Sequence, residues 1–532
     1  MSDKQPVFIL PENIQRMIGR DAQRNNILAA KLVADTIKTT LGPKGMDKML
    51  VNSMGDITIT NDGVTILEEM EVEHPAAKML VEVAKTQENT IGDGTTTSVI
   101  IAGKLLENSE KLLDKRIHPV MIAKGYRIAE ERCRDILDKI SSRIDIKDDN
   151  LLKNIAKTAM TGKGAEIAKE KFAEIIVKAV KQIMDDKGKI DMGNIKIEKN
   201  IGDGVEDTEL IEGIIIDKEK ASSDMPSMIQ NAKIALLDIP LEIKGPETDT
   251  KISVTSPEQL QLFIDMEEKT IKDMVKKIKE SKANVIFCQK GIDDIAQYYF
   301  SRENILAVRR VAQGDMEKLS KATGARIIGN LNELNEKHLG YSKLVEEIKN
   351  RNSKMIYVRD CKNPKALTIL IRGGTGHVVD EIERAIKDGL GDVASALESG
   401  KIVAGGGAIE VETARLLRKI PLKGREMLAV EQFADALESI PIILAENAGL
   451  DPIDILTELK ARHQRGENKA GLNLFNGKIE DTLKQGIIEP LNLKIQAIKS
   501  ASEVAIMLLR IDDVIASGKQ PQQNMPNMNG MY

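Results

Sequence analysis

The residues best suited to chemistry form the segment Gly92-Asp93-Gly94-Thr95-Thr96-Thr97, which directly precedes the apolar run SVIIAGKLL. Its two glycines allow backbone amides to approach an anion closely. Three hydroxyls at a helix N-terminus add donors where the helix dipole favours negative charge. Asp93 supplies a carboxylate, which Mg²⁺ commonly binds together with phosphate oxygens. The segment lacks the GK[ST] of a Walker A loop and the third glycine of GxGxxG, so an ordinary helix cap is the alternative interpretation.

The chain contains a comparison for this motif. Gly202-Asp203-Gly204 repeats the tripeptide but continues with Val-Glu-Asp and has no run of hydroxyl groups. We predict a simple turn at this second copy. The three threonines therefore distinguish the first copy, and we predict a nucleotide-phosphate site there.

Three other loops contain residues that could assist such a site. Leu41-Gly42-Pro43-Lys44-Gly45 can bring backbone close to a phosphate or ribose, although Gly and then Pro also mark ordinary helix ends. Gly405-Gly406-Gly407 costs much chain entropy, which suggests that another group packs against its bare backbone. Thr161-Gly162-Lys163-Gly164 could place an ammonium near a γ-phosphate, whereas a solvated loop lysine is the commoner outcome.

Two carboxylates could orient a water for attack on a γ-phosphate, a reaction that depends mainly on positioning and charge neutralisation. Asp62 lies in DITITNDGVTIL, where two β-branched runs predict a hairpin around Asn61-Asp62-Gly63. Aspartate is favoured in such turns by local hydrogen bonding. Asp388 lies in the helical pattern VVDEIERAIKDGLGDV, where a carboxylate is normally solvated. Nothing in the local sequence indicates that the two aspartates converge.

The elements that position these residues belong to a long chain of 532 residues, enough for about three or four domains. The formal charge of −5 and the 2% aromatic content argue against nucleic acid as the main partner. Three dispersed cysteines and five histidines without HExxH argue against a disulfide framework and a zinc enzyme. We find no signal-peptide core and no apolar run of the ~18–20 residues that a membrane span requires. We therefore expect a soluble, cytoplasmic, multidomain protein.

Hydrophobic periodicity divides the chain into helical ends and an α/β centre. Helical spacing dominates the first 150 residues and the segment from about Gly405 to Ser517. Between them, apolar runs such as KIALLDI, ANVIFCQ and ALTILIR alternate with helical segments, which is typical of an α/β domain. The two helical ends could form one domain, but the pattern alone does not establish that they meet.

Two segments depart from this pattern. Residues 243–282 carry a polar extended piece and then a helix that opens with a capping box at Ser256. Leu262 and Met266 add apolar surface outside its main stripe, so a buried core helix and an exposed tip that touches a partner both stay open. The tail from Gly518 is rich in Gln, Asn, Met and Pro, and we predict that it is disordered.

Taken together, these motifs resemble the chaperonins, most closely the archaeal group II type, the thermosome. Matching blocks run over nearly the whole chain and include TTLGPKGMDKML, TNDGVTIL, GDGTTT, ILIRGGTGHVV, VAGGGAIEVE and LLRIDDVI. The resemblance implies a multidomain α and α/β fold. A mostly helical equatorial ATPase domain would comprise 1–145 and 404–517, and an α/β intermediate domain 146–213 and 367–403. An α/β apical client-binding domain would span 214–366, with a helical protrusion at about 243–282 as built-in lid, and 518–532 would form the tail.

The resemblance also implies roles for individual residues. Asp93 would bind magnesium, and Asp62 and Asp388 would position and activate the hydrolytic water. Lys163 would sense the γ-phosphate. The other implied nucleotide contacts are Leu41, Gly42, Gly94, Thr95, Thr96, Thr97, Gly406, Asn473 and Glu489. One departure is Gly389, where the family usually has alanine; a glycine there could loosen the helix by up to about 1 kcal/mol.

The function implied is that of an ATP-dependent chaperone that uses ATP and Mg²⁺ and hydrolyses the ATP. It would enclose unfolded client proteins in two stacked rings of eight or nine subunits, alone or with paralogues, without a separate lid protein. LLRIDDVI would add a strand to a neighbour's sheet. Nucleic acid and membrane are not expected as partners. The alternatives are a soluble metabolic enzyme with a phosphate site, and a nucleotide-binding scaffold that no longer hydrolyses.

Overall fold

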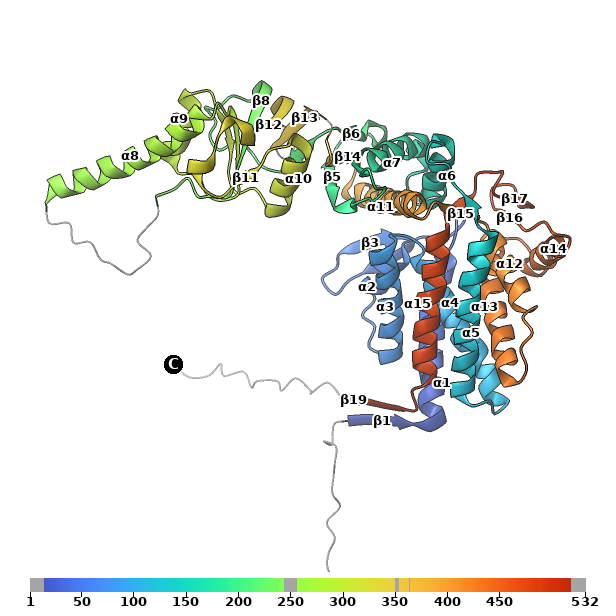
Figure 1. The fold of residues 1–532 in the computed structure, drawn as a ribbon. Coiled ribbons are helices and arrows are strands. Elements are labelled where there is room, and N and C mark those ends of the chain that lie inside the picture. Colours follow the sequence, from blue (N-terminus) through green and yellow to red (C-terminus); the bar gives the residue numbers. More distant parts are fainter. Residues whose placement is uncertain (1–13, 244–255, 350–353, 363, 518–532) are drawn as a thin grey trace, which may run out of the picture. The chain divides into compact units, whose positions relative to one another are not determined.

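The computed structural model describes residues 14–243, 256–349, 354–362 and 364–517, and Figure 1 shows the fold. The chain divides into two compact units, Met1–Arg143 with Lys401–Tyr532, and Ile144–Gly400. The two helical ends therefore meet in one unit, which the periodicity had left open. The predicted combination of a helical part and an α/β part is confirmed.

The helices of the first unit pack around α4 (Thr95–Asp114), which contacts α1, α3, α13 and α15. Apolar residues lie on several sides of α4, and such a helix is stable only when other helices cover it. At Gly103 an added Cβ would lie 2.4 Å from the Cβ of Ala34, so this glycine permits close packing against α1. The other helices of the first unit are α1 (Gly19–Ile37), α2 (Gly63–Glu69), α3 (Pro75–Thr90), α5 (Pro119–Ile140), α12 (Ala408–Leu417), α13 (Arg425–Asn447), α14 (Pro452–Gln464) and α15 (Leu491–Leu509).

Short sheets complete the first unit. Strand β1 (Ile14–Ile18) pairs antiparallel with β19 (Asp513–Ser517), so residues from the two ends of the chain are directly hydrogen-bonded. Strand β15 (Lys401–Ala404) lies between β4 (Ser142–Arg143) and β18 (Ile488–Pro490). The remaining pairs are β2 (Lys48–Val51) with β3 (Ile57–Thr60), and β16 (Ala470–Asn473) with β17 (Lys478–Asp481).

The predicted hairpin around Asn61-Asp62-Gly63 is wrong. The hairpin is formed by β2 and β3, and GVTIL belongs to α2. The reason is a helix cap: Asp62 accepts a hydrogen bond from the backbone amide of Thr65 at 3.0 Å. Capping of a helix and local bonding in a turn use the same aspartate chemistry, so the residue type did not distinguish them.

Within the residues that the structure describes, the second unit contains two sheets. In the smaller one, β14 (Leu367–Gly373) lies between β5 (Ile195–Ile201) and β6 (Glu209–Ile211). Helix α11 (Gly376–Ser399) packs against both α6 (Asp149–Met160) and α7 (Lys169–Ile183). The second GDG copy precedes a short 3-10 helix, Val205–Asp207, and Gly202 has a positive φ, so the predicted turn is confirmed.

The larger sheet has seven described strands: six form the path β10-β9-β8-β12-β13-β7, and β11 pairs with β8. Buried aliphatic clusters lie against it. Its strands are β7 (Ile214–Ile216), β8 (Met228–Leu237), β9 (Val285–Cys288), β10 (Leu306–Val308), β11 (Ile327–Ile328), β12 (Gly340–Lys349) and β13 (Lys354–Cys361). The accompanying helices are α8 (Pro257–Glu280), α9 (Asp294–Arg302) and α10 (Gln313–Thr323).

Helix α8 is buried in one part and exposed in another, so the core interpretation is confirmed for only part of it, and contact with a partner stays a prediction. Ile271, Val275 and Ile278 are buried towards its C-terminal end. Leu262 and Met266 are 63% and 66% exposed towards its N-terminal end, which extends away from the sheet in Figure 1. The polar piece at 244–255, the side chain of Phe263 and the tail from Gly518 lie outside the described residues. Within the described part of the chain, no helix is long and apolar enough to cross a membrane.

Candidate functional site

The phosphate-loop candidate lies between α3 and α4. Gly94 caps α4 in the left-handed region, with φ at 78°, and Gly92 also has a positive φ. The buried amide of Gln87 donates to the backbone oxygen of Asp93 at 2.8 Å. A Cβ on Gly94 would lie 2.9 Å from Cδ1 of Leu493, so both conformation and space favour glycine there. The loop is thus fixed directly before the first turn of α4, where Thr95, Thr96 and Thr97 lie.

Asp62 is connected to this loop. Its Oδ2 accepts hydrogen bonds from the amide and the hydroxyl of Thr65, at 3.0 and 2.6 Å. Its Oδ1 accepts from the hydroxyl of Thr95 at 3.3 Å. A Cβ on Gly63 would lie only 2.5 Å from Oγ1 of Thr96. The start of α2 therefore lies directly beside the start of α4, and a carboxylate stands next to the hydroxyl run.

The loop at Leu41 and Gly42 is held by α13. Asn447 donates to the backbone oxygens of Lys38 and Leu41, at 3.0 and 2.9 Å. Gly42 has φ at 82°, and a Cβ on it would lie 2.4 Å from a methyl of Leu444. The segment follows the short 3-10 helix Lys38–Thr40 at the end of α1, so it is also the helix stop that the sequence indicated.

The triple glycine has the packing that its sequence predicted. A Cβ on Gly406 would lie 2.5 Å from the backbone oxygen of Leu472, and one on Gly407 would lie 2.6 Å from Cβ of Pro441. The backbone oxygen of Gly406 accepts from the amide of Leu472 at 2.8 Å. Bare backbone at this point therefore lets α12 begin directly against the β16–β17 hairpin and α13.

The two residues expected near the nucleoside are both engaged within the protein. The amide of Asn473 donates to Glu480 at 2.6 Å and its oxygen accepts from the amide of Phe475 at 3.0 Å. The Glu489 side chain is 19% exposed and forms an ion pair with Lys494. Burial raises the pKa of Glu489, and the attraction of Lys494 only partly opposes this.

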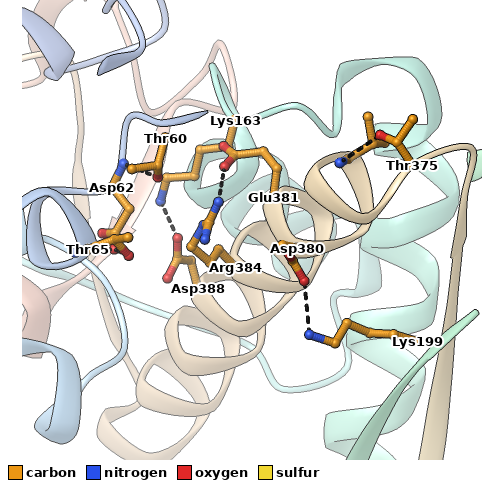
Figure 2. A network of polar contacts seen from close by, with 11 residues as sticks. Thr60, Asp62, Thr65, Lys163, Lys199, Thr375, Asp380, Glu381, Arg384 and Asp388 are labelled. Carbon is orange, nitrogen blue, oxygen red and sulfur yellow. Dashed lines mark hydrogen bonds and ion pairs between the residues drawn. The ribbon is translucent and has the colours of Figure 1, made fainter. Parts of the chain in front are cut away.

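Lys163 and Asp388 lie together in the second unit, as Figure 2 shows. The ammonium of Lys163 is 2.5 Å from Oδ2 of Asp388, and their side chains are 19% and 8% exposed. Neither residue is the solvated surface group that its local sequence suggested. In helix α11, a Cβ on Gly389 would lie 2.7 Å from Cδ1 of Ile176. The departure from alanine thus coincides with very close packing of α11 against α7.

The described structure therefore gathers the predicted residues in two places. Asp93, the threonine run, Asp62 and the glycine loops belong to the first unit, whereas Lys163 and Asp388 belong to the second. The convergence of Asp62 with Asp388 stays a prediction. Sequence reasoning missed Gln87, Asn447, Glu410 and Lys494. Lys494 and Glu410 had one usable signal, because each is a charged residue within an apolar helical run.

The comparisons with known proteins decide the family. The model of the TCP-1/cpn60 chaperonin family matches residues 33–519. The chain belongs to this chaperonin family. This chaperonin is 59% identical over 520 residues to the thermosome subunit of Methanopyrus kandleri, covering 97% of this chain and 95% of that one. It is 57% identical over 518 residues to the thermosome subunit beta of Archaeoglobus fulgidus, covering 96% and 95% of the two chains.

A solved structure agrees with this assignment. The chaperonin is similar to the open-state monomer of a group II chaperonin from Methanococcoides burtonii, with a TM-score of 0.58 and 46% identity over 79% of this chain and 100% of that chain. The predicted chaperonin fold and function are thereby confirmed, and the chain is an ATP-dependent chaperone of the group II type. The alternative of a metabolic enzyme has no support in these comparisons.

Proposed function

We propose that this chaperonin hydrolyses ATP and uses the cycle to fold unfolded proteins inside a double ring closed by its own lid. The observation that carries the proposal is the loop before α4. It combines two glycines of positive φ, a carboxylate at Asp93, and three hydroxyls at the start of a long helix. This donor set suits a phosphate group, and the adjacent carboxylate suits a magnesium ion that accompanies it.

Each side of this loop has residues that fit the rest of a nucleotide. Gly94 and the three threonines would bind phosphate oxygens, with Leu41 and Gly42 on the opposite side. Gly406, Asn473 and Glu489 would contact the ribose and base. Asp93 would hold Mg²⁺, which when bound neutralises phosphate charge. The fit rests on bare backbone at Gly94 and Gly406, where a side chain would collide with neighbouring atoms.

The hydrolytic step would depend on three charged side chains of this chain. Asp388, with Asp62, would orient the attacking water and accept its proton. The contact of Lys163 with Asp388 implies a competition, because a γ-phosphate would draw the same ammonium away from the carboxylate. Release of Asp388 from its ion pair would restore a free acceptor for the water. Binding of ATP and readiness for hydrolysis would thus be linked through one lysine.

We propose assembly into rings of eight or nine subunits, and two features of the first unit support association between subunits. The β2–β3 hairpin exposes five large apolar side chains: Met49, Val51, Met54, Ile57 and Ile59. β1 and β19 form a sheet of only two strands in the described chain. A sheet of two strands is only marginally stable by itself. We therefore propose that the β2–β3 hairpin of a neighbouring subunit extends the β1–β19 sheet. β19 would then join a neighbour, as predicted for LLRIDDVI, while it stays paired with β1.

The lid and client contacts would use α8. Leu262, Ile264 and Met266 are exposed at 63%, 46% and 66%. Exposed apolar groups of this kind mark interaction surfaces, and closure would withdraw them from solvent. We propose unfolded proteins as clients and the cytoplasm as location, without nucleic acid or membrane partners and without a separate lid protein. We propose rings of this subunit alone or with paralogues, since Archaeoglobus fulgidus has both alpha and beta thermosome subunits.

Three measurements on the purified chain test the proposal. Light scattering on a sizing column should give a mass near a megadalton, and phosphate release should require ATP with Mg²⁺. A chemically denatured client enzyme should regain activity with ATP and not without it. A persistent monomer would contradict self-assembly. Client binding without any phosphate release would instead favour the non-hydrolysing scaffold.

A further inference from the structure

The beginning of α15 contacts both sides of the proposed nucleotide site. Leu493 packs against Gly94, since a Cβ on that glycine would lie 2.9 Å from Cδ1 of Leu493. The next residue, Lys494, turns to the nucleoside side. Its ammonium is 2.8 Å from Oε1 of Glu410 and is also ion-paired with Oε2 of Glu489. Adjacent residues of one helix thus reach the phosphate loop and a proposed nucleoside contact.

This ionic cluster is almost withdrawn from water. The side chains of Lys494 and Glu410 are 9% and 2% exposed. Desolvation opposes the charge on Lys494, but the two carboxylates outweigh it and raise the pKa of the lysine well above its usual range. Buried ion pairs commonly contribute no more stability than apolar residues of the same volume. The cluster therefore calls for a reason other than stability.

The surroundings of the cluster connect it to the phosphate loop. A small cavity is lined by Thr97, Glu410, Thr413 and Lys494, together with apolar groups. Thr97 is one of the three hydroxyl residues of the loop. Glu410 lies in the first turn of α12, directly after the triple glycine. Glu489 is in β18, opposite Val403 of β15. One ammonium therefore links the elements that border the site on three sides.

We propose that Lys494 is a positioning residue that anchors the Glu489 carboxylate on Glu410, so that Glu489 accepts hydrogen bonds from the ribose hydroxyls of the nucleotide. The inference rests on the proposed function, in which Glu489 contacts the nucleoside. A carboxylate is a suitable partner for ribose hydroxyls, as in many dinucleotide sites. Without the ammonium, the two carboxylates repel each other and Glu489 has no fixed direction.

Equilibrium binding of ATP and of 2′,3′-dideoxy-ATP tests this role without recourse to hydrolysis. The wild-type chaperonin should bind ATP about tenfold more tightly than the dideoxy compound, as expected for hydrogen bonds to a charged acceptor. K494M and E489Q should each lose this preference. K494R should restore most of it, because an arginine can pair with both carboxylates. K499M is the matched control, since Lys499 lies exposed on the same helix, and it should keep the wild-type preference.

The double variant E410Q/K494M can replace K494M in this test if K494M does not fold. In the wild type, the two carboxylates and the ammonium have a net charge of −1. In the double variant only the Glu489 carboxylate remains, which is also −1, so the buried net charge is unchanged. It should lose the ribose preference as K494M does. The inference is overturned if a folded K494M, or the double variant in its place, keeps the preference for ATP. Equal weakening of the binding of both nucleotides would also overturn it. It is also overturned if wild-type protein binds ATP without distinguishing the two compounds. A wild-type protein that binds neither nucleotide would refute the proposed function itself.

Discussion

The ammonium of Lys163 lies 2.5 Å from the carboxylate of Asp388, although the two residues are 225 positions apart in the chain. Lys163 belongs to the loop after α6 and Asp388 to the middle of α11, and both are largely withdrawn from solvent. The pair gives the proposed γ-phosphate sensor and the proposed water-activating residue a shared contact. Single and double substitutions of Lys163 and Asp388 can therefore separate what the pair contributes to stability from what each residue contributes to catalysis.

Replacement of Asp388 by asparagine should leave ATP binding nearly unchanged and slow phosphate release by at least about 100-fold, the usual contribution of a general base. Binding is measured by titration calorimetry and turnover by phosphate release. D380N is the matched control, because Asp380 lies on the same helix and forms an exposed ion pair with Lys199. Turnover of D388N at the wild-type rate would remove Asp388 from the mechanism.

Replacement of Lys163 by methionine should cost stability and activity for different reasons. It leaves the nearly buried Asp388 carboxylate without this ammonium, and breaking a buried pair costs about 3–5 kcal/mol. Adding D388N should recover much of this stability but none of the hydrolysis. Denaturant unfolding and phosphate release on the two single variants and the double variant measure both effects. Equal stability of K163M and K163M/D388N would contradict the argument that the Asp388 carboxylate causes the loss.

Replacement of Gly389 by alanine should destabilise the fold despite the better helix propensity of alanine. Propensity favours alanine by about 1 kcal/mol. Overpacking against Cδ1 of Ile176, 2.7 Å from the new Cβ, costs about 1–3 kcal/mol. The double variant G389A/I176V removes that methyl and should recover the loss. Thermal unfolding of the wild type and the two variants checks this, and a G389A protein more stable than wild type would contradict the packing argument.

Acid should remove a contribution to stability at Glu412. Burial alone would raise the pKa of this carboxyl, but hydrogen bonds from His463 and Arg415 outweigh it and lower the pKa to about 2. A lowered pKa in the folded state stabilises the protein above the unfolded value of 4.5. This contribution, of roughly 2–3 kcal/mol, is lost as the pH falls from 4.5 towards 2.

The variant E412Q should therefore be less stable than wild type at pH 6, and the difference should shrink as the pH approaches 2. Denaturant unfolding at several pH values measures it. E458Q is the control, because Glu458 is an exposed residue of α14 that pairs with Arg462, and its substitution should change stability little at any pH. A constant difference between E412Q and wild type across this range would contradict the linkage.

Much of the fold was predictable because its signals are local. Helical spacing in the two ends, β-α alternation in the centre, and the turn at Gly202 all depend on near neighbours in sequence. The same holds for the glycines at 405–407, whose bare backbone does pack against other atoms. The prediction of a hairpin around Asp62 was wrong because an N-cap and a turn use the same short-range hydrogen bonds.

The motifs spread along the chain were sufficient to indicate the family and to identify the residue types of the phosphate loop. The contacts between distant residues became visible only in the folded chain. They join the strands of the two chain ends, Asp62 with Thr95, Lys163 with Asp388, and Lys494 with Glu410 and Glu489. The physical reason is that local conformation follows from hydrogen bonds and periodicity within a few residues. Long-range ion pairs depend instead on how helices pack, and that packing is shared among many side chains along the chain.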